Sequence, residues 1–510
     1  MLQLSNNLYL IFARKRFSHG AERPFLMTPG RESLMYAELD SITGRIQSQL
    51  IKLGIKPGDR VMAQVDKSYE AVLLYLACLR AGAIYVPLNT AYTVAEVAYF
   101  MEDASPRLFV STPWSYDKLA SVANRVGVQH LLTLDCDGSG SLLLGLNTLD
   151  PGPPVVDCKG DDLAAILYTS GTTGRPKGAM LSHANLTSNA QVLHSYWHWQ
   201  DGDDVLLHAL PIFHVHGLFV ALHCALLGAS PVYFLPGFDI DTIIGLLPQC
   251  TVMMGVPTFY TRLLDSEGFN AKLCRNMRLF ISGSAPLLPE THHSFEARSG
   301  HRILERYGMT ETGMIASNPY LGERVAGTVG FALPGISVRI ADKHGTELPR
   351  GETGVLEMTG PNLFKGYWQM PGKTREEVRD DGWFISGDLA AMDDEGRITI
   401  VGRAKDLIIS GGYNVYAKEI ELEIDAIPGV RESAVIGVPH ADFGEAVVAV
   451  VVRDESRELT ERDIIAALQD RLARFKQPKR IYLVAELPRN SMGKVEKAQL
   501  RETYQATYRS

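Results

Sequence analysis

The sequence predicts an α/β protein with more than one domain, built mostly from doubly wound parallel sheets. Short apolar segments of strand length alternate with segments of helical apolar spacing, which is typical of helices wound around parallel strands. The chain has 510 residues, whereas single hydrophobic cores stop growing near ~250–300 residues. From about residue 325 to residue 400 the pattern changes to short strands and turns, which predicts a small β-rich unit.

The alternation is present on both sides of a glycine-rich segment near residue 170. Residues 69–80 have helical spacing, and residues 84–88 read as a buried strand stopped by Pro87. Further strands are expected at 205–207, 252–254 and 279–281, with a helix at 218–227. Ligands in such sheets bind at the carboxyl ends of the strands. We therefore expect residues 282–285 and 307–311, which follow short apolar strands, to line that edge.

One apolar run, residues 217–236, has the length of a membrane span. His223 lies inside it, and the sequence Gly-Ala-Ser-Pro at 228–231 interrupts it. These features favour a buried helix, a turn and a strand at 232–234 over a membrane-spanning helix.

The last hundred residues read as a separate α+β module of ordinary domain size. Helices are expected at 417–427 and 461–473, and strands at 432–438 and 446–452. We place the boundary near Lys405, which divides the chain into domains 1–404 and 405–510.

The composition is that of a globular enzyme, with 46% hydrophobic and 21% charged residues. The net charge of −8 disfavours a general surface for nucleic acid or anionic membranes. Six cysteines without a C-x-x-C pair suggest neither a zinc knuckle nor a disulfide framework. At the N-terminus the apolar residues precede the cations, which is the reverse of a secretory signal, so we expect a cytoplasmic protein.

Residues 169–178 predict a phosphate-binding loop. Glycines let the backbone approach an anion, hydroxyls donate hydrogen bonds, and a lysine supplies charge. It is not a Walker A loop, because Pro176 precedes the lysine and Gly178 follows it. The alternative is a polar turn. The candidate phosphate-binding residues are Thr169, Ser170, Gly171, Thr172, Thr173, Gly174 and Lys177.

Seven segments in a fixed order together resemble the adenylate-forming superfamily, which includes acyl-CoA synthetases, luciferases and the adenylation domains of peptide synthetases. They are residues 168–178, 210–214, 283–285, 307–311, 386–388, 402–406 and 488–494. The resemblance implies a large N-terminal domain of two αβ subdomains plus a small β-barrel, joined by a hinge to a small mobile C-terminal domain. It also implies ATP, Mg²⁺ and CoA as cofactors or co-substrates. A carboxylate attacks the α-phosphate of ATP, and a thiol then displaces AMP.

The resemblance carries site residues onto this chain. The implied catalytic residues are Lys494, His214, Thr310 and Glu311, with Glu311 also the implied Mg²⁺ ligand. The implied nucleotide contacts outside the loop are Gly283, Ser284, Ala285, Glu305, Tyr307, Gly308, Asp388 and Arg403. The implied hinge and CoA-channel residues are Lys405, Ser410, Gly411, Gly412 and Tyr413.

Each of these roles has a plainer alternative. Glu311 suits magnesium as a hard oxygen donor, and its alternative is a surface acid or an N-cap partner. Asp388 offers two oxygens to the ribose hydroxyls, although Gly-Asp alone usually marks a turn. Tyr307 offers a flat face for adenine, or packs in the core. Lys494 acts only if the small domain folds over the site; otherwise it is solvated. His214 and His216 lack a third ligand at zinc spacing.

Within the superfamily, residues 210–217, 256–262 and 282–287 look most like malonyl-CoA synthetases. A second carboxylate on the acid needs a cationic partner when it is buried, and Arg262 is the candidate. Its alternative is a solvated arginine paired with a nearby acid. Where malonyl-CoA synthetases place a second arginine, this chain has His292 and His293, and we assign His293 to the acid. Val215 and Met309 are the expected pocket walls.

The predicted function is an AMP-forming acid–CoA ligase acting on a small carboxylic acid, malonate or methylmalonate. The alternatives are a short- or medium-chain monocarboxylate ligase, transfer to a carrier-protein thiol, and a nucleotide-binding regulator without catalysis. Retention of Lys177, Glu311, Asp388 and Lys494 argues against the last of these. The expected partners are the acid and CoA, without nucleic acid or a membrane span, and the sequence leaves monomer and homodimer open.

Overall fold

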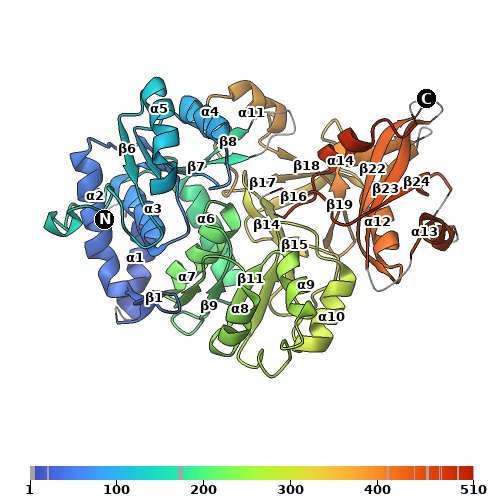
Figure 1. Ribbon diagram of the computed structural model, residues 1–510, viewed down its shortest axis with the longest axis horizontal. Coiled ribbons are helices and arrows are strands. Elements are labelled where there is room, and N and C mark those ends of the chain that lie inside the picture. The colour runs from blue at the N-terminus through green and yellow to red at the C-terminus, as the bar shows by residue number, and fades with distance from the viewer. Residues whose placement is uncertain are drawn as a thin grey trace.

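The structure is a computed structural model in which four sheets are arranged as two αβ layers, a β-rich unit and a separate C-terminal module (Figure 1). It describes residues 6–19, 22–169, 176–410, 413–440, 443–454, 459–469, 471–472, 474–490 and 493–508. The expected α/β fold, with a large N-terminal part and a distinct C-terminal module, is confirmed.

The first sheet has six strands in the order β6-β5-β3-β4-β7-β8, parallel except for the last pair. Met62 packs with Val97 and Phe100 on one face, while its neighbours Val61 and Ala63 join the main core on the other. Alternate side chains of β3 therefore point to opposite faces of the sheet, and both faces are covered by helices. Its elements are α2 Leu39–Lys52, β3 Arg60–Gln64, α3 Tyr69–Ala81, β4 Ile84–Pro87, α4 Val94–Ala104, β5 Leu108–Ser111, α5 Tyr116–Val126, β6 His130–Thr133, β7 Leu163–Thr169 and β8 Lys177–Ser182.

The second sheet has nine strands in the order β15-β14-β13-β12-β11-β9-β10-β1-β2. The strands from β1 to β13 along this order are parallel neighbours, and the outer pairs are antiparallel. Its elements are α1 Leu8–His19, β1 Pro24–Met27, β2 Leu34–Met35, α6 His183–Tyr196, β9 Leu206–His208, α7 Leu222–Gly228, β10 Val232–Phe234, α8 Ile240–Leu246, β11 Val252–Gly255, α9 Pro257–Asp265, β12 Leu279–Ser282, α10 Pro289–Ser299, β13 Leu304–Met309, β14 Gly313–Ser317 and β15 Phe331–Ala332.

The apolar run folds as the sequence predicted, with one difference. The helix expected at 218–227 starts as a π-helix, His216–Ala221, and continues as α7; β10 follows after a turn. Among the described residues, no helix combines the length and the apolar character that crossing a bilayer requires.

The β-rich unit is an antiparallel sheet in the order β16-β17-β18-β19, and an isolated bridge from Ile398 to Gly330 joins it to the loop before β15. Its elements are β16 Ser337–Ala341, β17 Gly354–Thr359, α11 Pro371–Glu377, β18 Phe384–Met392 and β19 Ile398–Arg403.

The C-terminal module has its own sheet and its own apolar clusters on both faces of that sheet. The short 3-10 helix Ala404–Asp406 separates β19 from this sheet, so the boundary predicted near Lys405 falls in a linker between two sheets. The helix predicted to reach residue 473 ends at Leu468. The elements are β20 Leu407–Ser410, β21 Tyr413–Tyr416, α12 Ala417–Asp425, β22 Val430–His440, β23 Gly444–Arg453, α13 Glu461–Leu468, β24 Arg480–Val484 and α14 Lys497–Tyr504.

Candidate functional site

The candidate site lies at the carboxyl ends of the parallel strands of the nine-stranded sheet. Strands β9, β11, β12 and β13 are consecutive parallel neighbours there, so the segments that follow them share one edge. Residues 282–285 leave β12 at this edge as expected. Residues 307–309 are the end of β13 itself, whereas we had expected them to follow the strand.

Asp388 is the centre of a three-residue group. The register of β18 against β19 sets Arg403 opposite Asp388, and the guanidinium Nε lies 2.6 Å from Asp388 Oδ1. The phenol of Tyr307 donates to the other carboxylate oxygen. Burial raises the pKa of Asp388, although Arg403 and Tyr307 act to lower it. The sequence motifs thus converge on one carboxylate whose oxygens both have partners within the chain.

The turn from β13 to β14 requires glycine at position 308. A Cβ atom there would lie 2.1 Å from the carbonyl oxygen of Gly313, and the register shifts between Tyr307 and Gly308. Such a bulge re-aims the residues beside it. On the same strand Glu305 is buried, and burial raises its pKa to about 8, although Lys418 of the C-terminal module acts to lower it.

Glu311 belongs to a buried hydrogen-bonded network. The phenol of Tyr367 lies 2.9 Å from Glu311 Oε1 and also bonds to Glu377. Lys177 Nζ lies 2.7 Å from Glu377 Oε1 and 4.1 Å from the centroid of the Tyr367 ring. Lys177, expected to contact phosphate, is therefore held by Glu377 of α11. Sequence reasoning did not find Tyr367 or Glu377, which lie in a segment without a catalytic motif.

Glu311 suits a magnesium ion. Burial raises the pKa of this carboxyl, so a bound cation would favour its ionised form. Only Oε1 accepts the Tyr367 hydrogen bond, which leaves Oε2 as a hard oxygen ligand of the kind Mg²⁺ prefers. When bound, the ion would neutralise phosphate charge.

Most of the glycine-rich loop lies outside the described residues. Thr169 ends β7 and Lys177 begins β8. Ser170, Gly171, Thr172, Thr173 and Gly174 fall in the undescribed interval, so their assignment to phosphate stays a prediction.

His214 and His216 lie where the chain after β9 approaches the segment after β12. His214 is half-buried. Desolvation, then the charges of Lys494 and Arg306, lower its pKa to about 3. Ser284 Oγ lies 3.2 Å from His216 Nδ1, and Ser284 has a left-handed backbone, with φ of 71°. Within the described part of the chain, no third metal ligand joins the two histidines. The imidazole of His214 is therefore uncharged at neutral pH.

Arg306 is a further residue that sequence reasoning missed. Its side chain is buried, and among the described residues no acceptor reaches its Nε or Nη2 atoms. Burial lowers its pKa to about 9, so it is still charged at neutral pH. A Cβ at Gly283 would lie 2.4 Å from the guanidinium carbon. Strand alternation offered a signal, since Arg306 must face away from its neighbour Tyr307.

The residues assigned to the acid from sequence lie in different places. Arg262 is exposed on α9, 5.5 Å from the centroid of the Phe238 ring. His293 is exposed on α10, beside Glu296. Val215 lines a small cavity with Thr310. Met309 is half-buried at the end of β13. By contrast, the cations whose charges lower the pKa of His214 are Lys494 and Arg306.

Lys494 reaches the site from the C-terminal module. Burial first, and then the charge of Arg403, lower the pKa of Lys494, while Asp388 and Glu311 act to raise it. The charges of both Asp388 and Glu311 therefore act on this lysine. Its loop is closed by reciprocal hydrogen bonds between Asn490 and Lys494, including Asn490 Oδ1 at 3.0 Å from the Lys494 amide.

The proposed hinge and channel residues are only partly described. Lys405 is exposed in the 3-10 helix, and Ser410 is buried at the end of β20. Gly411 and Gly412 lie outside the described residues, and Tyr413 begins β21. Arg501 Nη1 of α14 lies 2.7 Å from Asp406 Oδ1, and this ion pair joins the proposed hinge segment to the small module.

The chain matches two families along most of its length. Residues 13–368 match the AMP-binding enzyme family, and residues 419–494 match the AMP-binding enzyme C-terminal domain. A malonate–CoA ligase of Arabidopsis thaliana is 34% identical over 95% of this chain and 87% of its own length. A mitochondrial malonate–CoA ligase of Mus musculus is 36% identical over 93% of this chain and 88% of its own.

Solved structures extend the likeness to the fold and to its conformation. ATP-bound MatB from Rhodopseudomonas palustris is 53% identical, covers 99% of this chain and 100% of its own, and gives a TM-score of 0.96. Apo MatB from the same organism has the same identity and coverage but a TM-score of 0.86. Because sequence and coverage are equal, the difference is conformational. The arrangement in Figure 1 is that of the ATP-bound relative.

Proposed function

This chain belongs to the AMP-binding enzyme family, and on that premise we propose that it is an AMP-forming malonate–CoA ligase in which Arg306 receives the second carboxylate. One carboxylate of malonate attacks the α-phosphate of ATP and releases pyrophosphate. The CoA thiol then displaces AMP from the malonyl-adenylate.

The nucleotide residues act by neutralising charge and fixing position. Asp388 accepts the ribose hydroxyls, Tyr307 lies against adenine, and Lys494 stabilises the negative charge shared by the attacking carboxylate and the α-phosphate. A cation aimed at developing charge in a desolvated site is a strong source of rate acceleration. Lys405 is the hinge that removes Lys494 for the thiol step, and the two MatB conformations support such a movement.

The observation that carries the choice of acid is the buried, unpaired guanidinium of Arg306. A buried charge without a counter-ion costs several kcal/mol. Activation leaves malonate with one free carboxylate, which is the counter-ion this position lacks. A monocarboxylate would leave Arg306 unpaired, so the site selects the dicarboxylate.

Replacement of Arg306 by leucine tests the proposal. Loss of one partner of a buried charge pair costs about 2–5 kcal/mol, so kcat/KM for malonate should fall roughly 30- to 4,000-fold. Activity with propionate should stay or rise. The variant should remain folded, since exchanging a buried unpaired charge for an apolar side chain is neutral or stabilising. AMP release with both acids measures selectivity, and a thermal melt checks the fold.

Arg262→Leu is the matched control, because it removes the arginine that sequence alone selected. Its exposed side chain predicts a smaller effect on malonate than that of Arg306→Leu. Equal losses on malonate and propionate in Arg306→Leu would refute the assignment. A loss of malonate selectivity in Arg262→Leu alone would return the role to Arg262.

Compartment and assembly are separate proposals. We retain a cytoplasmic location, which fractionation of the source cells tests; the mouse relative is named as mitochondrial. Light scattering of the purified chain decides between monomer and homodimer.

A further inference from the structure

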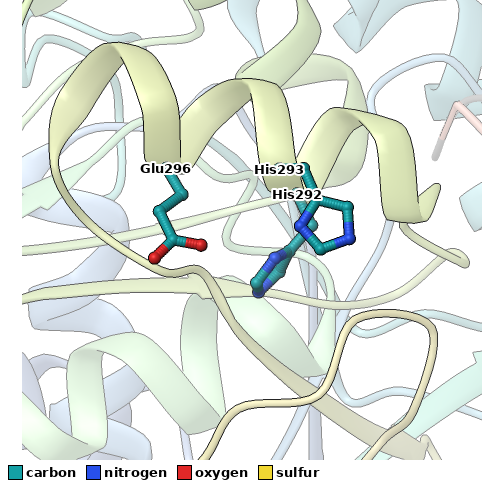
Figure 2. A group of neighbouring side chains, drawn as sticks. All are labelled: His292, His293 and Glu296. Atoms are coloured by element: carbon teal, nitrogen blue, oxygen red, sulfur yellow. The ribbon is translucent and has the colours of Figure 1, made fainter.

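Helix α10 carries three neighbouring side chains with the atoms of a metal site: His292, His293 and Glu296 (Figure 2). Their ligand atoms all lie within 4.8 Å of one another, and in the described part of the chain this is the one such group. Helical spacing explains the proximity, because Glu296 lies three and four positions beyond the histidines, on the same side of the helix.

A hydrogen bond made by one ring nitrogen of His292 leaves the other nitrogen available as a metal ligand. Its Nε2 lies 3.0 Å from the carbonyl oxygen of Ile303, which fixes the proton on Nε2 and leaves the lone pair on Nδ1. The side chain is 2% exposed, and no donor among the described residues reaches Nδ1. Histidines that bind metals usually hold their other N–H in this way.

The other two ligands can adjust to an ion. His293 is exposed, and the Glu296 side chain is 35% exposed. Arg302 Nε lies 2.7 Å from Glu296 Oε1, which leaves Oε2 for a ligand. Tetrahedral zinc with bonds near 2.0 Å sets its ligands about 3.3 Å apart. Rotation of the His293 and Glu296 side chains can bring the ligand atoms from within 4.8 Å of one another to that shorter separation.

We propose that His292 Nδ1, His293 and Glu296 form a site for one divalent transition metal ion of the Zn²⁺ class, with water as the fourth ligand. Two imidazoles and one carboxylate favour Zn²⁺ over Mg²⁺ or Ca²⁺, which prefer oxygen ligands. The group does not include Glu311.

Calorimetric titration of the full chain with Zn²⁺ tests the site. The protein is first treated with chelator and dialysed, and nucleotide is left out because it binds zinc itself. Excess Mg²⁺ keeps the oxygen ligand Glu311 from contributing. We expect one Zn²⁺ per chain and a higher melting temperature with Zn²⁺, since binding to the folded state stabilises it. Co²⁺ in place of Zn²⁺ should give the visible spectrum of a tetrahedral site.

Four variants separate this site from other zinc binding. His293→Ala and Glu296→Gln should each weaken binding at least tenfold and abolish the rise in melting temperature. His344→Ala removes an exposed histidine in the turn after β16 and should leave binding unchanged. Arg302→Ala removes the cation that competes for Glu296 and should tighten binding severalfold.

Unchanged zinc affinity in both His293→Ala and Glu296→Gln would overturn the proposal. So would binding without a defined stoichiometry in the unmodified chain. Loss in His293→Ala and Glu296→Gln, with retention in His344→Ala, would establish it.

Discussion

The two proposed ends of the site differ in whether their charged side chains are paired within the chain. At the nucleotide end, Asp388 already pairs with Arg403 and Tyr307, and Lys177 pairs with Glu377. At the acid end, Arg306 is buried without an acceptor among the described residues. Asp388 and Lys177 at the nucleotide end thus have partners before substrate binds, whereas Arg306 at the acid end has none in the part of the chain that the structure describes.

This difference shows where selectivity resides. A nucleotide must compete with partners that the chain already supplies, so each of its contacts is an exchange with a modest net gain. An acid with a second carboxylate meets a charge that has lost its hydration and gained no partner. On the proposed assignment, the acid end is therefore the more selective one, and the nucleotide end depends on Lys494.

Among the variants that test this comparison, Lys494→Ala should have the largest effect, because we propose that this residue serves the chemistry between the two ends. Removal of one group that stabilises developing charge costs about 10²–10³-fold in rate. We expect that loss in malonate-dependent pyrophosphate exchange. Formation of malonyl-CoA from supplied malonyl-adenylate should change little, since in the proposed mechanism Lys494 leaves the site before the thiol step.

The exposed Lys343→Ala is the control and should keep both half-reactions. Pyrophosphate exchange that survives in Lys494→Ala would show that the lysine does not act in adenylation. Equal losses in both half-reactions would show instead that Lys494 stabilises the structure.

Gly283→Ala should have an intermediate effect confined to the acid end. The added Cβ would lie 2.4 Å from the guanidinium carbon of Arg306, so the arginine must move. Misplacement of a group by about 1 Å can cost up to 10²-fold, and we expect KM for malonate to rise by about tenfold or more. Steady-state kinetics should show the KM for ATP within a factor of two.

Gly245→Ala is the matched control, because a Cβ there meets no atom within 4 Å. A larger effect of Gly283→Ala on ATP than on malonate would contradict the division of the site into two ends.

Tyr307→Phe should have the smallest effect, confined to the nucleotide end. The change removes the hydrogen bond that orients Asp388, worth about 0.5–1.5 kcal/mol, while Arg403 still holds the other carboxylate oxygen. We expect KM for ATP to rise about two- to tenfold, with KM for malonate unchanged. A change in malonate KM equal to that in ATP KM would mean that Tyr307 couples the two ends.

Local patterns predicted much of the fold. The helix expected at 69–80 is α3, and the strand expected at 232–234 is β10, since apolar spacing and turn residues act over short distances. The pairing of β1 with β10 was not predictable, because the two strands lie about two hundred residues apart. Nothing local in either strand specifies its partner.

The same distinction between local sequence patterns and long-range contacts holds for the candidate site. Motifs identified Asp388 and Lys494 because their neighbours in sequence carry the pattern. The pairing of Lys177 with Glu377 spans 200 residues and depends on how α11 packs. Arg306 was missed because it stands one residue before a motif, and only its burial without a partner shows its importance.

The unpaired guanidinium of Arg306 also links catalysis to the lifetime of the protein. On the proposed assignment, free enzyme carries a destabilising charge that malonate neutralises, so substrate raises the free energy of unfolding. Proteolysis acts mainly on unfolded or partly opened chains. Cells rich in malonate would therefore accumulate this enzyme without any change in its synthesis, and starved cells would clear it.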